Sequence, residues 1–136
     1  MSDVQIAALE RRYGDRKALE GVTVAVPQGA TLAVFGANGA GKTTLLRVLA
    51  GLLKPHGGHA EVLGSKLPDE AWKVRGRVGY LGHESLLYRD LSVRQNLLFH
   101  ARLHGVAPER VDEQIAAVGL PQRAADPVRE DRKSVV

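Results

Sequence analysis

The fold is decided by eight consecutive residues, Gly36-Ala37-Asn38-Gly39-Ala40-Gly41-Lys42-Thr43. They match the pattern G-x-x-x-x-G-K-[ST] at every fixed position. In this pattern the glycines allow backbone turns that side chains forbid, so that successive N–H groups point inward and form a cradle for an anion. The N-terminus of the helix that follows adds partial positive charge. We therefore expect this loop to bind phosphate groups.

The segments on both sides of the loop have the patterns that such a loop requires. Residues 31–35 form a short, nearly continuous apolar run, which is typical of a strand buried on both faces. Residues 43–50 have helical character, and Gly51 and Pro55 are suitable to end the helix. Strand, loop and helix in this order favour a nucleotide site. The glycine spacing does not support a dinucleotide fingerprint.

Three side chains at the end of the loop have predicted roles toward a nucleoside triphosphate. Lys42 would reach the β- and γ-phosphates, and the Thr43 hydroxyl would ligate Mg²⁺. Thr44 is one position further along and would touch the α-phosphate.

Apolar periodicity predicts the elements of the remaining chain. Alternating residues indicate strands around Val4 to Ala8 and Val22 to Val26. Residues 60–63 and 78–81 are further short strand candidates. Helices are expected at 68–74, at 93–104 with Ser92 as the N-cap, and at 109–118. The order indicates an α/β core with a helical part attached near the C-terminal end.

Composition excludes several classes of protein. The 136 residues carry a net charge of +4, are 44% hydrophobic and 25% charged, and suggest one globular domain or a piece of one. The absence of cysteine rules out disulfides, thiolate metal sites and a cysteine nucleophile. An aromatic content of 4% is too low for a stacking platform, so no nucleic-acid partner is expected. Neither a membrane span nor a secretory signal is predicted.

Beyond the loop, three features resemble the ATP-binding subunit of an ABC transporter, over residues 4 to about 130. About three strands precede the loop, as in that nucleotide-binding domain. Tyr13-Gly14, followed by Ala18-Leu19, is similar to the family's aromatic loop, in which the ring stacks on adenine. Residues 78–81 and then 91–97 resemble the family's strand, Q-loop and entry to the helical subdomain that contacts the membrane partner.

The resemblance implies an α/β P-loop NTPase core with an N-terminal antiparallel β subdomain and part of an α-helical subdomain. Residues 1–130 would be a truncated nucleotide-binding domain, with the β subdomain and core over about 1–90 and the helical subdomain over about 91–130.

The implied activity is ATP hydrolysis with ATP and Mg²⁺ as cofactors. The implied partners are a transmembrane permease and a second ATP-binding subunit in a head-to-tail dimer. The protein would be cytoplasmic and peripheral at the inner face of the cell membrane. The residues expected to hold the nucleotide are Tyr13, Gly36, Ala37, Asn38, Gly39, Ala40, Gly41, Lys42, Thr43 and Thr44.

One position departs from the family pattern. Members usually carry Gln after the strand at 78–81, where it meets Mg²⁺ and the attacking water, but His83 stands at that place here. An imidazole can exchange hydrogen bonds and ligate metal, so His83 is a candidate catalytic and metal residue that would stop helping when protonated. The other interpretation is an exposed loop histidine. Gln95 is no substitute, because it falls inside the next helix.

The transport cargo is indicated only by local similarity. Leu81-Gly82-His83 and residues 99–105 look most like haem-exporter subunits of cytochrome c maturation, although drug- and polysaccharide-export subunits share much of the pattern. His100 and His104 lie one helical turn apart. Without an evident third ligand, a solvated helix face is the better interpretation than a zinc site.

Several family elements do not occur in this sequence: the Walker B Asp with its following Glu, the switch His and an L-S-G-G-Q-like signature. We therefore expect weak or absent hydrolysis by this chain alone.

Residues 131–136 do not continue the family pattern and match one reading frame of a DNA-sequencing adapter, so a non-native tail is expected there, with a natural terminus as the alternative. Two other functions stay open, a non-catalytic nucleotide-binding regulatory module and another P-loop enzyme such as a GTPase or small kinase.

Overall fold

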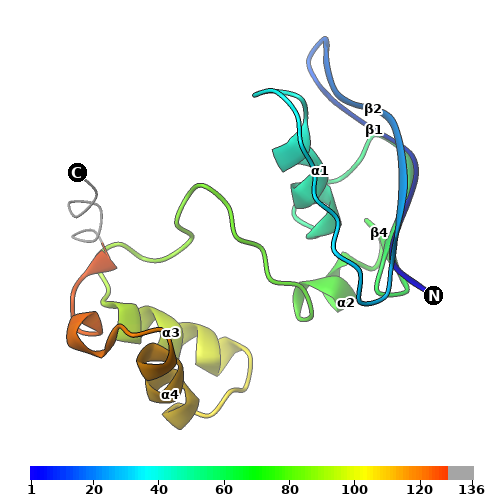
Figure 1. Ribbon diagram of the computed structural model, residues 1–136. Helices are drawn as coiled ribbons and strands as arrows, with labels where there is room; N and C mark the ends of the chain where they lie inside the picture. The colour runs from blue at the N-terminus through cyan, green and yellow to red at the C-terminus, as the bar shows by residue number, and fades with distance from the viewer. Residues whose placement is uncertain (129–136) are drawn as a thin grey trace. The chain divides into compact units, whose positions relative to one another are not determined.

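The structure, a computed structural model, describes residues 1–128. The chain divides into two compact units, Met1–Gly82 and His83–Val136 (Figure 1). The predicted non-native tail at 131–136 lies outside the described residues. The subdomain boundary near residue 90 and its family assignment remain predictions.

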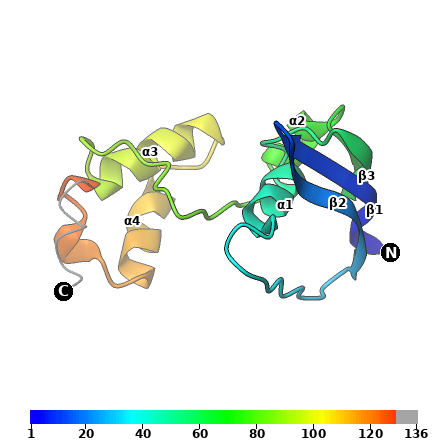
Figure 2. The same ribbon diagram turned by 90° about the horizontal axis from the view of Figure 1, so that it is seen from above.

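The first unit is built on a four-stranded antiparallel sheet in the order β2-β1-β3-β4 (Figure 2). Its strands are β1 Ser2–Tyr13, β2 Arg16–Pro27, β3 Gly57–Val62 and β4 Ser65–Leu67. Strands form at the three predicted places, but in β1 the alternation breaks after Ile6, because Ala8 is exposed with a φ of 48° and Leu9 is buried instead. Because successive side chains of a strand point to opposite faces, the alternation leaves one face of the sheet apolar.

Two helices cover the apolar face of this sheet. They are α1 Lys42–Leu49 and α2 Ala71–Arg75, and both lie on the same side of the strands in Figures 1 and 2. The helix predicted after the loop is confirmed, and Gly51 follows it with a positive φ of 69°. The buried core contains Ile6, Leu9, Leu19, Leu45, Val48, Ala60, Val62, Leu67, Ala71 and Val74.

Two predicted strands do not form in the described chain. Residues 31–35 and 78–81 have no strand conformation, and the Phe35 and Leu81 side chains are 90% and 97% exposed. Figure 2 shows the first of these segments within the cyan loop between β2 and α1. A strand is held by ladder hydrogen bonds and cross-strand side-chain pairs. Within residues 1–128 no strand pairs with either segment. The prediction of about three strands before the loop is therefore wrong, since two form there.

The second unit contains α3 Val93–Leu103, α4 Glu109–Ala117 and a short 3₁₀ turn at Pro121–Arg123. The predicted helices and the Ser92 cap are confirmed. The Ser92 hydroxyl accepts a hydrogen bond from the Gln95 backbone N–H at 3.1 Å, and the Gln95 side chain accepts one from the Ser92 backbone N–H at 2.8 Å. This reciprocal pairing satisfies two amides that a helix start leaves without partners. Gln95 is thus a capping residue inside α3.

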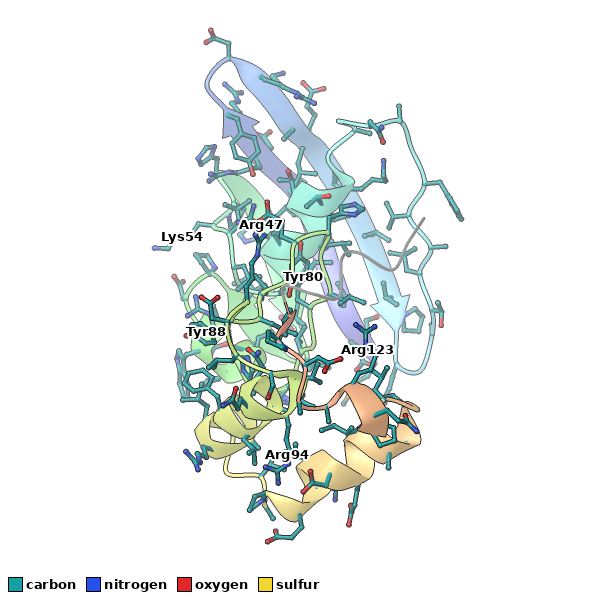
Figure 3. All side chains as sticks on the ribbon, turned by 90° about the vertical axis from the view of Figure 1, so that its left-hand side faces the viewer. Arg47, Lys54, Tyr80, Tyr88, Arg94 and Arg123 are labelled. Carbon is teal, nitrogen blue, oxygen red and sulfur yellow. The ribbon has the colours of Figure 1, made fainter. Side chains whose placement is uncertain are left out.

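A bidentate ion pair joins the two helices. The Arg94 guanidinium, labelled in Figure 3, donates to both carboxylate oxygens of Asp112 at 2.7 and 2.9 Å. Hydrogen bonding by Arg94 lowers the pKa of the Asp112 carboxyl below its usual 3.8. The pair therefore stabilises the folded unit above about pH 4, the carboxyl's unfolded range, and this contribution disappears as the pH falls through the folded-state pKa.

Replacing Asp112 by asparagine should remove that pH-dependent step. We expect the helical circular dichroism of the native chain to fall more steeply below about pH 4 than that of Asp112→Asn. Because the pair is exposed, the difference should shrink at about 1 M salt. Identical acid titrations for the two proteins would show that the pair does not contribute to folding.

Among the described residues, the helices are all too short or too polar to cross a membrane.

Candidate functional site

The glycine-rich loop leads directly into α1. Gly39 and Gly41 have φ values of 83° and 100°, a backbone region that glycine adopts without the strain of a Cβ. Gly41 is the N-cap residue, and its carbonyl accepts the first intrahelical hydrogen bond, from the Leu45 N–H at 2.9 Å. The N–H groups of a first helical turn have no intrahelical partner. The loop therefore ends at a helix N-terminus, a position that favours an anion.

The end of the loop is pressed against β2. A Cβ placed on Gly41 would lie 2.1 Å from the Ala18 carbonyl oxygen and 3.2 Å from Cδ2 of Leu19. No real Cβ comes that close to a carbonyl oxygen, so only glycine fits at this position. The close approach fixes the start of α1, and with it the loop, on the sheet.

The Lys42 side chain folds back over the loop. Its Nζ donates hydrogen bonds to the carbonyls of Gly36 at 2.6 Å and Ala37 at 2.7 Å. The Ala40 N–H closes a turn on the Ala37 carbonyl at 3.1 Å. The ammonium group is thus held at the loop itself, where it supplies positive charge for a phosphate. A helix N-terminus and a lysine both favour an anion, and the binding of a nucleoside triphosphate here stays a prediction.

A second cation, Arg16, contacts the loop and was not among the predicted site residues. One guanidinium nitrogen, Nη2, donates to the Gly39 carbonyl at 2.5 Å. Arg16 opens β2, directly after the turn at Gly14 and Asp15. No local sequence signal marked it, because the contact joins residues 23 apart in the chain.

Tyr13 ends β1 at the tip of the same hairpin. It is the register partner of Arg16, and the residue is 46% exposed. The Arg11 guanidinium carbon lies 5.1 Å from the ring centre, in cation–π geometry. The part of this ring in adenine stacking remains a prediction.

The other residues predicted to bind the nucleotide lie in the loop or in the helical turn that follows it. Ala37, Asn38 and Ala40 are exposed members of the loop, and Thr43 and Thr44 lie in the first turn of α1, with Thr43 exposed. His83 is an exposed residue at the start of the second unit. Its proposed meeting with Mg²⁺ and water remains a prediction.

His100 and His104 line one shallow apolar groove of about 300 Å³ between α3 and α4, together with Leu97, Ala101 and Val111. Within residues 1–128 no three metal-ligating side chains come together, at this groove or elsewhere. His104 is exposed but His100 is half-buried, so the interpretation of the pair as a solvated helix face stays a prediction.

Known proteins resemble this chain over nearly all of its length. It is 42% identical over 131 residues to the daunorubicin resistance ATP-binding protein DrrA3 of Streptomyces coeruleorubidus, covering 93% of this chain and 42% of that protein. It is 33% identical over 118 residues to the bacitracin transport ATP-binding protein BcrA of Bacillus licheniformis, covering 86% of this chain and 39% of that protein. The chain therefore spans less than half the length of these relatives.

A solved structure titled as the ATP-binding subunit of an ABC transporter matches the fold. The TM-score is 0.77 and the identity 26%, over 91% of this chain and 53% of that one. This likeness confirms the predicted fold class, an antiparallel β subdomain with helices that covers part of the ATPase domain. The family model described as ABC transporter matches residues 19–135. With the loop geometry, the relatives and this match in agreement, the chain belongs to the ABC transporter family of ATP-binding proteins.

Proposed function

We propose that this chain binds Mg²⁺·ATP as the nucleotide-binding part of an ABC export ATPase. The observation that carries the proposal is the loop at Gly36 to Thr43, whose positive-φ glycines lie at the start of α1 and whose lysine is held over the loop carbonyls. This is the arrangement through which P-loop proteins bind triphosphates. Membership of the family supports ATP as the nucleotide.

Each site residue has a role in this proposal. Amides of the loop other than that of Ala40, which already donates to the Ala37 carbonyl, bind the phosphates. Lys42 turns from its carbonyl partners to the β- and γ-phosphates, and the Thr43 hydroxyl ligates Mg²⁺. Thr44 contacts the α-phosphate, and Tyr13 stacks on adenine. His83 takes the place of the Q-loop Gln beside Mg²⁺ and the attacking water. The bound metal would neutralise charge that develops on the phosphates.

Hydrolysis would need parts that this sequence does not contain, namely the signature, the Walker B Asp and the switch His. A second ATP-binding subunit in a head-to-tail dimer and a transmembrane permease complete the proposed assembly. The permease would hold the protein at the inner face of the cell membrane. The names of the relatives, which concern daunorubicin resistance and bacitracin transport, support export of a drug-like compound. The Leu81-Gly82-His83 sequence is the feature that favours haem export for cytochrome c maturation instead.

The direct test is Mg²⁺·ATP binding by the native chain and by Lys42→Ala, measured by calorimetry. Hydrogen bonds to charged groups contribute about 1.5–3 kcal/mol, so we expect the Kd to rise roughly 10- to 100-fold in the variant. Lys17→Met is the matched control, because it removes a charge from the same unit in an exposed pair with Glu20. Equal ATP affinity in Lys42→Ala and the native chain would disprove the proposal.

Comparing ATP with GTP separates this proposal from a GTPase. A stacked Tyr13 ring tolerates either base, since every base has a π-face. We therefore expect similar affinities, whereas a strong preference for GTP would indicate guanine-specific contacts and a different enzyme.

A further inference from the structure

Arg16 touches both parts of the proposed nucleotide site. Its guanidinium donates to the Gly39 carbonyl at 2.5 Å, in the middle of the phosphate loop. Its backbone is the register partner of Tyr13, the residue proposed to stack on the base. One side chain therefore links the tip of the β1–β2 hairpin to the loop.

β2 comes close to the loop at two residues, Arg16 and Ala18. A Cβ placed on Gly39 would lie 2.5 Å from Nη2 of Arg16, and one placed on Gly41 would lie 2.1 Å from the Ala18 carbonyl oxygen. The Ala18 contact is made by the backbone carbonyl, and the register of β2 shifts at this residue, since Arg11 pairs with Leu19 but Arg12 pairs with Lys17. Lys17, between Arg16 and Ala18, pairs with Glu20 in an exposed ion pair. The start of β2 therefore meets the loop through the Arg16 side chain, the Ala18 backbone and the Leu19 side chain.

The chemistry of the contact leaves the cradle open for phosphate. Arg16 binds a carbonyl oxygen of the loop, whereas a phosphate is bound by loop N–H groups and the lysine. Both sets of hydrogen bonds can therefore exist together. A guanidinium has no acceptor and keeps its charge, so the link does not change with pH in the physiological range.

We propose that Arg16 is a positioning residue that couples base binding to phosphate binding. It fixes the hairpin tip, and the Tyr13 ring with it, relative to the phosphate loop, so that the ring is in place when the triphosphate is bound. This inference rests on the proposed function of the loop. It assigns Arg16 no direct contact with the nucleotide.

The test compares Mg²⁺·ATP with inorganic tripolyphosphate, which has no base to stack. We expect Arg16→Met to raise the Kd for ATP about tenfold, because the Tyr13 ring is then no longer held in place to stack on the base. The Kd for tripolyphosphate should change less than twofold. Arg16→Lys should recover part of the ATP affinity, because an ammonium can also donate to the Gly39 carbonyl. Lys17→Met, which removes a charge one residue away, should leave both constants unchanged.

A double-variant cycle with Tyr13→Ala tests the coupling itself. Tyr13→Ala should weaken ATP binding about tenfold in the native chain and less than twofold in the Arg16→Met chain. Additive losses would overturn the proposal, and so would an equal loss of tripolyphosphate affinity in Arg16→Met, which would place the guanidinium on the phosphates. Thermal unfolding of each variant checks that the unit is folded.

Failure of this inference can be told apart from failure of the proposed function. If Lys42→Ala weakens both ligands while Arg16→Met affects them equally or not at all, only the coupling is wrong. If Lys42→Ala changes neither ligand, the loop is not the nucleotide site.

Discussion

Replacing Gly41 by alanine should destabilise the first unit by about 3–5 kcal/mol and abolish binding of Mg²⁺·ATP. The backbone at Gly41 has a φ of 100°, which a residue with a Cβ adopts only under strain. The added carbon would also lie 2.1 Å from the Ala18 carbonyl oxygen. To relieve that clash, α1 must move away from β2 and expose Leu45 and Val48, two buried core residues.

Urea unfolding measures the loss in Gly41→Ala, with far-UV circular dichroism and the fluorescence of Trp72 as signals. Trp72 is the single tryptophan of the chain and lies on α2 of the first unit. Gly64→Ala is the matched control, because Gly64 has a φ of 75° but no atom lies within 4 Å of the place that a Cβ would occupy there. It carries the backbone strain without the clash and should cost about 1–2 kcal/mol. Equal losses in the two variants would refute the close contact between the loop and β2.

The phosphate loop could be predicted from sequence because its signal is local. The glycine spacing and the lysine of residues 36–43 carry the information in adjacent positions, and α1 follows them as predicted. The same holds for α3, whose Ser92 and Gln95 form the capping box within four residues. Local hydrogen bonding decides such features, so the rest of the chain has little influence on them.

The failed strand predictions show where local reasoning stops. The apolar run at 31–35 has the composition of a central strand, but strand formation depends on neighbours elsewhere in the chain. Within the part of the chain that the structure describes, no strand pairs with it. Strand propensity alone cannot supply those ladder hydrogen bonds, so the segment stays outside the sheet and exposed.

Arg16 was missed for a related reason. Its role depends on a contact over 23 residues, to the Gly39 carbonyl. A basic residue after a hairpin turn is ordinary in a sequence, and nothing local marks it as different from Lys17 beside it. The contact between β2 and the loop depends on the tertiary fold, so the residues next to Arg16 in the sequence do not indicate it.

Replacing Asn96 by leucine should destabilise the second unit by about 3 kcal/mol, although the two side chains have similar shapes. Asn96 is fully buried at the start of α3. Its Oδ1 accepts from the Tyr88 N–H at 2.8 Å, and its Nδ2 donates to the carbonyls of Tyr88 at 3.0 Å, Leu91 at 3.3 Å and Ser92 at 3.0 Å. Tyr88 is labelled in Figure 3. One side chain thus holds the turn that precedes the helix, and leucine would leave the Tyr88 N–H without its acceptor or force the turn open.

Hydrogen exchange of the α3 amides measures this effect, because a local opening of the turn exposes them before the whole chain unfolds. Ser92→Ala is the comparison variant, because it removes the cap at the same helix end. It should lower the stability of the helix start by about 1 kcal/mol. A loss of about 3 kcal/mol lowers protection roughly 150-fold, against about fivefold for the cap variant. If Asn96→Leu exchanges no faster than Ser92→Ala, the turn does not depend on the asparagine, and the capping box alone organises the start of the helix.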